Sequence, residues 1–317
     1  MDFTALLNTI IMLFITLVIG FVANRLGIFD ETTSKKLSRL IVTICQPALI
    51  ISSLIKLPFT TDNLKLGLTT LGIGIIVHLL LSGIAFLLCR PFRDIDEQKL
   101  IEFSIIFGNV GFIGFPILES LLGEKGLFMG AFFIVSFHLV LWTWGIAIFA
   151  RKRNDIKLTV KKIFINFGTV PCTIGILLFI LKFVISEFPV YITTTLGYLG
   201  NMCTPVSMLI IGALIGRRNL IAFFTSWKAY YLSLLKLIIT PVVVCIFIML
   251  LGFNTEIVIF MSTVCALPTA TMVSILAEMY NTKPEFSAQL VGMSSLLSIV
   301  TIPLVLKFVE FFINICT

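Results

Sequence analysis

Residues 108–116 read GNVGFIGFP, with three glycines spaced by three, one asparagine and one proline. They interrupt an apolar run that extends from Ile101 to Leu122. Glycine permits backbone shapes that other residues resist, and proline lacks an amide hydrogen, so a soluble protein would place this string in a surface turn. Here it stands in a segment long enough to cross a membrane. The string therefore predicts a membrane helix that is broken within the bilayer.

The composition excludes a soluble protein. Of the 317 residues, 58% are hydrophobic, 12% are charged and 30 are phenylalanine. An apolar run of about 20 residues is long enough to span the hydrocarbon layer as a helix. We expect an all-α integral membrane protein with ten such helices, over residues 5–24, 37–55, 66–89, 101–122, 126–150, 163–185, 192–216, 229–251, 257–279 and 286–313.

The positive charges indicate how the chain is oriented. Of the 23 Lys and Arg residues, 17 lie in the connections after the first, third, fifth, seventh and ninth runs. Five lie in the other connections and the chain ends, and one, Lys236, lies within a run. Because cytoplasmic loops carry the excess of positive charge, both termini are expected outside the cytoplasm of a cell membrane. The basic stretch 151–162 is then a cytoplasmic linker. The net charge of +7 is dispersed over loops, so no nucleic-acid partner is expected, and the seven cysteines lack the spacing of a metal site.

The two halves resemble each other. With a shift of 158 residues, Cys45-Gln46-Pro47 aligns with Cys203-Thr204-Pro205, and His78 aligns with Lys236. Each half, 1–150 and 163–317, holds five runs, and an odd number makes the second half enter the membrane upside down. Such inverted repeats recur in secondary transporters.

The second half has its own interruption, ALPTAT at 266–271, and Pro268 corresponds to Pro116 after a slip of six residues. Freed backbone groups cannot face lipid, so both breaks must be buried or line a cavity. If the breaks cross, the N-termini of two half-helices favour an anion. An ordinary proline kink is the alternative. The candidate site residues are Gly108, Asn109, Gly111, Thr269 and Thr271 for binding, with Gly114, Pro116 and Pro268 shaping the breaks.

Three ionisable residues, His78, His138 and Lys236, lie deep within the runs. His138 would either contact the anion or be a packed histidine bonded to a neighbouring carbonyl. His78 and Lys236 would serve coupling or structure, and Lys236 could extend its ammonium to the interface. Glu278 is placed with them as a coupling or structural candidate, although it stands near a helix end, as do Glu102 and Glu119, where solvation is the default expectation.

Several motifs together resemble the auxin efflux carrier family. Asn109, Gly114 and Pro116 look like its crossover segment, ALPTATMVSILAEMYN (266–281) is similar to its second crossover, and SIVTIPLVL (298–306) is typical. The resemblance covers essentially the whole chain. It implies a five-plus-five inverted fold related to the bile-acid/sodium symporters. The first, second, sixth and seventh helices would form a dimerising scaffold, and the others a transport domain that moves as an elevator.

The resemblance also assigns residues. Asn109 matches the asparagine that contacts substrate in plant members. His138, four residues before Trp142, replaces a substrate-facing glutamine, and Glu278 replaces a lysine. These departures favour the microbial branch over transport of auxin itself.

We therefore expect a secondary transporter, not an enzyme, that moves small organic anions such as malate, malonate or auxin-like acids. Its partners would be lipid, the anion and a second copy of the chain, with no cofactor and no metal. A channel or ligand sensor on the same scaffold is the alternative. A membrane-embedded enzyme is disfavoured because His138 has no evident catalytic partner in the sequence.

Overall fold

The computed structural model describes residues 3–153, 166, 168–185, 187–217 and 224–316. Within them the regular elements are helices, and seven helical stretches are long and apolar enough to cross a membrane: Phe3–Arg25, Glu31–Lys56, Thr61–Leu88, Val110–Ala150, Val190–Gly216, Trp227–Leu250 and Pro284–Ile315. Two shorter apolar helices are Thr169–Leu181 and Thr255–Ala266. This is the architecture of an integral membrane protein. Most of the predicted linker 151–162 and the start of the run 163–185 lie outside the described residues.

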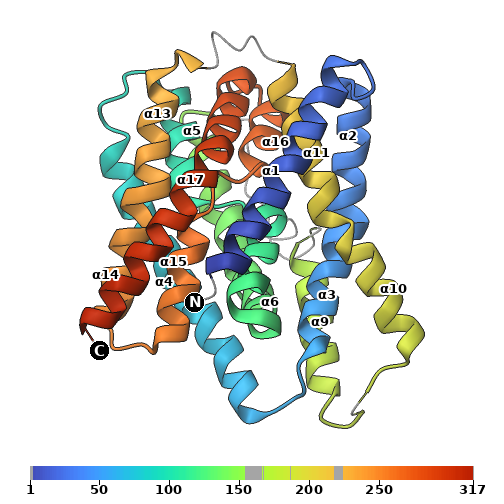
Figure 1. Cartoon of the computed structure of the whole chain (residues 1–317). Helices are drawn as coiled ribbons and strands as arrows, with labels where there is room; N and C mark the ends of the chain where they lie inside the picture. Colours follow the sequence, from blue (N-terminus) through green and yellow to red (C-terminus); the bar gives the residue numbers. More distant parts are fainter. Residues whose placement is uncertain (1–2, 154–165, 167, 186, 218–223, 317) are drawn as a thin grey trace.

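The helices are, in chain order, α1 (Phe3–Arg25), α2 (Glu31–Leu40), α3 (Gln46–Lys56), α4 (Thr61–Leu88), α5 (Ile95–Ile106), α6 (Phe115–Val140), α7 (Ile146–Ala150), α9 (Thr169–Leu181), α10 (Val190–Asn201), α11 (Cys203–Gly216), α13 (Trp227–Leu234), α14 (Thr240–Leu250), α15 (Thr255–Ala266), α16 (Met272–Met279) and α17 (Pro284–Cys316). Four π-helical turns connect some of them: η1 (Ile41–Cys45), η2 (Val110–Gly114), η3 (Leu141–Gly145) and η4 (Leu235–Ile239). Figure 1 shows them as one bundle, with both chain ends in its lower half.

Three of the four π-helical turns precede a proline by the same interval. Pro47, Pro116 and Pro241 are each the second residue of the α-helix that follows η1, η2 and η4. A proline ring clashes with the carbonyl of the preceding turn and cannot donate an amide hydrogen, so a widened turn before it relieves both problems. The prolines thus bend their helices without ending them.

The long stretch Val110–Ala150 reverses direction at Gly123. This glycine has φ +61° and ψ −145°, a backbone conformation that side-chain-bearing residues rarely adopt. A Cβ added at Gly126 would lie 2.2 Å from the Leu118 carbonyl oxygen, so the chain folds back closely on itself. The part after Gly123 covers the predicted run 126–150, whereas the part before it covers only the later portion of the predicted run 101–122, whose earlier portion lies in α5.

Small residues allow the closest helix contacts. A Cβ added at Gly20 would lie 2.2 Å from the carbonyl oxygen of Leu209, and one at Gly212 would lie 1.9 Å from that of Leu17. Glycine at these positions therefore lets α1 and α11 approach backbone to backbone, a common packing mode where lipid removes the hydrophobic drive between helices. Elsewhere α3 packs against α9 and α10, α4 against α5 and α6, and α14 against α15.

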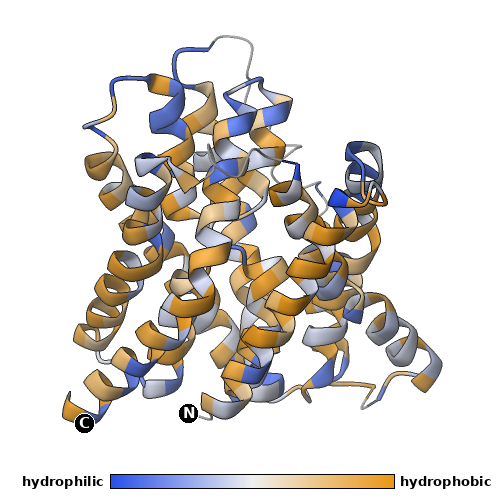
Figure 2. Ribbon diagram, turned by 45° about the horizontal axis from the view of Figure 1, so that its top comes forward, coloured by the Kyte–Doolittle hydropathy of each residue, from blue (hydrophilic) through white to orange (hydrophobic). Residues whose placement is uncertain are grey.

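Ion pairs join the connections between helices at the two ends of the bundle. At one end Lys283 Nζ lies 3.0 Å from Glu97 Oε1, and Lys228 Nζ lies 2.6 Å from Glu97 Oε2. At the other end Lys125 pairs with Glu256 at 3.4 Å. Figure 2 shows hydrophobic residues along most of the helices and hydrophilic residues mainly at the upper end.

Glu102 corrects one prediction. Solvation at a helix end was expected, but the side chain is fully buried and pairs with Arg151, whose guanidinium nitrogens lie 2.9 and 3.0 Å from its carboxylate oxygens. A buried carboxylate needs such a partner because leaving it unpaired would be strongly destabilising.

Candidate functional site

The two predicted breaks lie side by side in the core. The first separates α5 from η2 at residues 107–109, and the second separates α15 from α16 at residues 267–271. Gly108 and Thr269 form an isolated antiparallel bridge. The Asn109 amide donates to the Pro268 carbonyl at 2.7 Å, and the Ala270 amide donates to the Phe107 carbonyl at 3.0 Å. The breaks thus satisfy several of each other's backbone groups, which lipid could not do.

Glycines permit this close pairing. A Cβ added at Gly108 would lie 2.9 Å from the Val264 carbonyl oxygen, and one at Gly114 would lie 2.7 Å from Leu267 Cδ1. Gly114 and Pro116 lie beyond the first break, in η2 and α6, rather than within it. The first break itself therefore consists of Phe107, Gly108 and Asn109.

A small cavity of about 40 Å³ lies against the breaks. Its lining includes Gly108, Asn109, Gly111, His138 and Thr271. The helices that begin after the breaks, η2 at Val110 and α16 at Met272, both contribute their first residues to this lining. Their N-termini carry partial positive charge, so both favour negative charge in the cavity.

A larger cavity of about 530 Å³ shares part of this lining. Gln46, His138 and Thr271 belong to both cavities. The larger cavity falls within the usual size range of ligand sites, about 300–1,000 Å³. Polar and apolar side chains both line it, and its charged lining residues are Lys35, Arg39, Arg217 and Glu278. Three cations against one carboxylate give this cavity a net positive lining.

Three side chains that line these cavities have buried polar atoms that make no hydrogen bond within the described residues: Asn109 Nδ2, both ring nitrogens of His138, and Trp142 Nε1. Thr269 Oγ1 is also buried and unpaired among the described residues, but Thr269 lines neither cavity. Leaving such an atom unpaired costs about 1–3 kcal/mol, so a cluster of them indicates a place for a ligand. The Asn109 amide nitrogen and the Trp142 indole nitrogen only donate, which favours a ligand rich in acceptors.

His138 is not the carbonyl-bonded histidine of the alternative interpretation. It is 4% exposed, and neither ring nitrogen has a hydrogen-bond partner among the described residues. A Cβ added at Gly168 would lie 1.9 Å from its Nε2, so the start of α9 accommodates the imidazole only because residue 168 is glycine. The ring faces both cavities, as a ligand-contacting side chain would.

Of the other ionisable candidates, His78 and Lys236 line neither cavity and Glu278 lines the larger one. His78 is buried away from both cavities, where Nδ1 bonds the Gly74 carbonyl at 2.6 Å and the ring stacks on Phe133. Lys236 is fully buried and its Nζ donates to the Ile105 carbonyl at 3.0 Å, so the prediction that its ammonium could extend to the interface is wrong.

The sequence interpretation missed two site residues. Gln46, from the start of α3, lines both cavities, and a Cβ added at Gly111 would lie 2.5 Å from its Nε2. Its place in the repeated Cys-x-Pro motif was the available signal. Trp142 also lines the larger cavity. Within the described residues no cluster of three His, Cys, Asp or Glu side chains could hold a metal ion.

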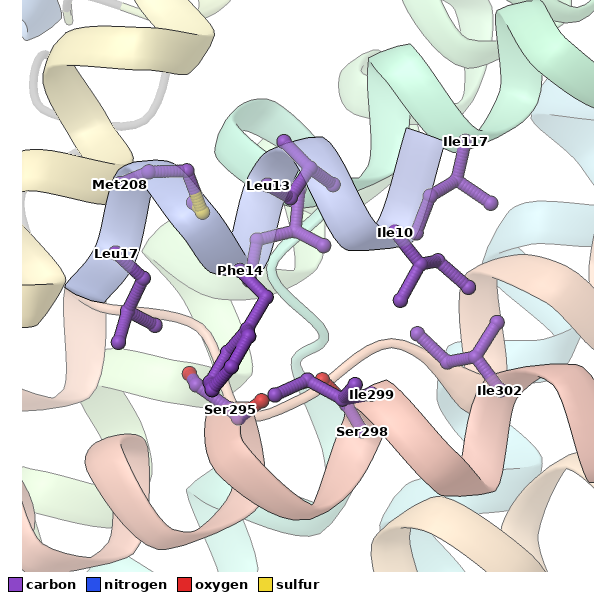
Figure 3. A pocket seen from close by; sticks show the side chains of 11 residues that line it. Ile10, Leu13, Phe14, Leu17, Ile117, Met208, Ser295, Ser298, Ile299 and Ile302 are labelled. Carbon is purple, nitrogen blue, oxygen red and sulfur yellow. The ribbon is translucent and has the colours of Figure 1, made fainter. Parts of the chain in front are cut away.

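A third cavity, of about 30 Å³, differs in character. Figure 3 shows its side chains, which come from α1, η2, α6, α11 and α17 and are aliphatic or aromatic apart from Met208, Ser295 and Ser298. It lacks charged residues and lies between α1 and α17. We interpret it as an imperfectly filled seam between helices rather than a binding site.

A cavity bordered by interrupted membrane helices and supplied with unpaired donors is the kind of site that membrane carriers use. The sequence matches the family described as "Membrane transport protein" over residues 5–306. The chain belongs to this family, which is the auxin efflux carrier family that the motifs indicated, and it is a multi-pass membrane protein.

Two archaeal relatives cover almost the same length. An uncharacterized transporter of Methanothermobacter thermautotrophicus is 23% identical over 311 residues, which make up 96% of this chain and 98% of the relative. An uncharacterized transporter of Methanocaldococcus jannaschii is also 23% identical, over 94% of this chain and 97% of its own length.

Proposed function

We propose that the protein is a secondary transporter for small organic anions, in particular carboxylates such as malate, malonate or auxin-like acids. The observation that carries the proposal is that unpaired buried atoms of Asn109 and His138 face a cavity that the N-termini of two broken helices also line. A carboxylate would accept from Asn109 Nδ2 and from His138, both of which line the small cavity. Hydrogen bonds to a charged group contribute about 1.5–3 kcal/mol each, so two or three would hold a small acid.

The larger cavity would be the route between this site and the cytoplasm. Lys35, Arg39 and Arg217 line it, and all three belong to connections that the charge distribution assigns to the cytoplasmic side. Their field would raise the local concentration of anions. The described conformation would then be the inward-facing state, with both chain termini on the outer side of the cell membrane.

The proposed architecture is ten spans arranged as two inverted repeats. It is supported by how the connections meet. Lys283, Lys228 and Glu97 belong to the connections after the ninth, seventh and third predicted helices, and they cluster at one end of the bundle. Lys125 and Glu256, in the connections after the fourth and eighth, pair at the other end. Ten membrane crossings would place the odd-numbered connections at one end of the bundle and the even-numbered connections at the other, as these contacts do.

The elevator part of the proposal is supported by the distribution of helix contacts. α1 packs most extensively on α11, and α3 on α9 and α10, while α4, α5 and α6 pack together, as do α13, α14, α15 and α17. The apolar seam of Figure 3 lies where α1 and α11 of the first group face α6 and α17 of the second. The lining of this seam has no charged side chain, which would ease sliding of one group past the other. The pair of Lys56 in α3 and Glu119 in α6, 3.7 Å apart at exposed positions, would have to break during that movement. The first group would form the homodimer.

Moving one net charge across the membrane is worth about 2.3 kcal/mol per 100 mV, so voltage alone would drive the exit of a monoanion from a cell. Uptake would need exchange or a coupling ion.

Flux and counterflow of labelled malate, malonate and indole-3-acetate in proteoliposomes would test the proposal, under separately imposed voltage, proton and sodium gradients. We expect saturable uptake and counterflow of at least one acid, lost in Asn109→Ala and kept in Asn201→Ala, a matched change at an exposed position of α10. Unsaturable flux without counterflow would indicate a channel, and no flux of any acid would contradict the proposal.

A further inference from the structure

Lys236 brings a positive charge to the crossing, the place where the breaks at residues 107–109 and 267–271 lie side by side. It lies in η4, its side chain is fully buried, and its Nζ donates to the carbonyl of Ile105 in the last turn of α5. A Cβ added at Gly108 would lie 3.6 Å from Nζ and 2.9 Å from the Val264 carbonyl oxygen. The ammonium therefore sits beside Gly108, where the C-terminal ends of both broken helices come together.

The same turn reaches the second broken helix. The Thr240 hydroxyl donates to the Lys236 carbonyl at 2.7 Å and lies 3.4 Å from the carbonyl of Cys265, in the last turn of α15. Each helix C-terminus carries about half a negative charge. Two of them amount to about one, which matches a single ammonium.

No other charge compensates Lys236 within the described residues. No ion pair to it is found there, and the buried Glu102 of α5 is paired with Arg151 at 2.9 Å. An isolated charge at this depth is costly and tends to mark an ion path or a functional counter-charge. Its hydrogen-bond partner is the Ile105 carbonyl of the first broken helix, and the C-terminal end of the second also lies beside Gly108. The half-helix N-termini on the cavity side of the crossing add positive potential for an anion.

In many carriers, the C-terminal ends and unwound carbonyls of broken helices coordinate the coupling cation. We propose that the Lys236 ammonium is a tethered substitute for that cation. The crossing is thus a monovalent cation site filled by the protein's own side chain, and no free Na⁺ is needed to assemble it. The cation-site part does not depend on what is carried. The consequence, anion transport that is independent of a sodium gradient, rests on the proposed function.

Thermal unfolding tests the cation site without any transport assay. The purified protein is unfolded in NaCl, KCl or methylammonium chloride, and in choline chloride at equal concentration, because choline is too large for the space of a lysine side chain. Lys236→Ala empties that space, whereas Lys236→Met removes the charge but fills the volume. We expect methylammonium or Na⁺ to raise the Tm of Lys236→Ala by about 3 °C or more relative to choline. The wild type and Lys236→Met should respond to none of the salts.

Two results would overturn the proposal: an identical Tm of Lys236→Ala in all four salts, or a rise in the wild-type Tm in Na⁺ equal to that of the variant. If Lys236→Ala unfolds on extraction in choline, its recovery in folded form in methylammonium supports the proposal, and recovery in neither salt counts against it. Because no readout here involves flux, the proposed transport function and the tethered cation can fail separately.

Discussion

Replacing Asn109 by alanine separates binding from stability. Asn109 Nδ2 is buried and unpaired in the described structure, while the Asn109 backbone amide makes the bond to Pro268 that joins the two breaks. The substitution removes the side-chain donor and leaves the backbone bond in place. Without ligand, the Asn109→Ala variant loses no hydrogen bond from Nδ2, so we expect its Tm to equal that of the wild type or to be slightly higher.

Anion binding should respond in the opposite way. A hydrogen bond to a carboxylate is worth about 1.5–3 kcal/mol, which corresponds to a loss of about 10- to 150-fold in affinity. Uptake of the transported acid in proteoliposomes and thermal unfolding of the same preparation measure the two effects together. Near-normal uptake by Asn109→Ala would refute the crossing site, and a large fall in Tm would show that the asparagine is structural.

Three further perturbations follow from the same geometry. His138→Gln should change substrate preference or the pH dependence of uptake while the Tm stays within about 2 °C of wild type, since neither ring nitrogen has a described partner to lose; a change in Tm alone would mean a structural histidine. The hydrogen bond from Lys283 holds the pKa of Asp94 below its ordinary value of 3.8, so this contact stabilises the protein above that pH and is lost as the pH falls through the lowered pKa. Lys283→Met should therefore lower the Tm at pH 6 and lose that difference at the most acidic pH, and a pH-independent difference would contradict the assignment. Gly212→Ala should destabilise the protein by about 1–3 kcal/mol, because the added Cβ would overpack against the Leu17 carbonyl. Gly72→Ala should be neutral or stabilising, because a Cβ there meets nothing within 4 Å. Equal effects of the two variants in thermal unfolding would contradict the close packing of α1 and α11.

The positions of the helix breaks could be predicted because glycine and proline act locally. A string such as GNVGFIGFP disfavours a continuous helix wherever it stands, and ALPTAT marks the second break for the same reason. The actual gap at residues 107–109 precedes Pro116 by seven residues or more, because a π-helical turn absorbs the proline. Composition could indicate a break, but it could not place the break to the residue.

Side-chain direction was harder to predict than depth. The sequence places Lys236 within a span but does not say whether it points to lipid, to the interface or to the core, and the structure places it against the Ile105 carbonyl. The same limit applies to Trp142, because the sequence does not say which way its indole points. Its neighbours in the cavity come from α2, α11 and α16, and only the packing of distant helices brings them together.

Gln46 shows what an internal repeat can and cannot reveal. Its motif aligns with Cys203-Thr204-Pro205, which suggested a shared structural role. In the fold, Gln46 lies against Gly111 in η2, the turn after the first break, and Cys203 Sγ lies 3.8 Å from the Gly111 carbonyl. Both copies of the motif therefore lie against the same residue. Sequence symmetry identified the pair, but their convergence on one residue required the three-dimensional arrangement.

The central claim is that a carboxylate binds at the crossing. Trp142 offers a direct reporter because it lines the larger cavity and its indole nitrogen has no hydrogen-bond partner among the described residues. Replacing Trp144 and Trp227 by phenylalanine leaves Trp142 as the only tryptophan. Titration of this variant with malate, malonate and phenylacetate should give a saturable change in fluorescence for at least one acid, and Asn109→Ala should shift the midpoint at least tenfold. A change that does not saturate, or one that Asn109→Ala leaves unaltered, would contradict the account.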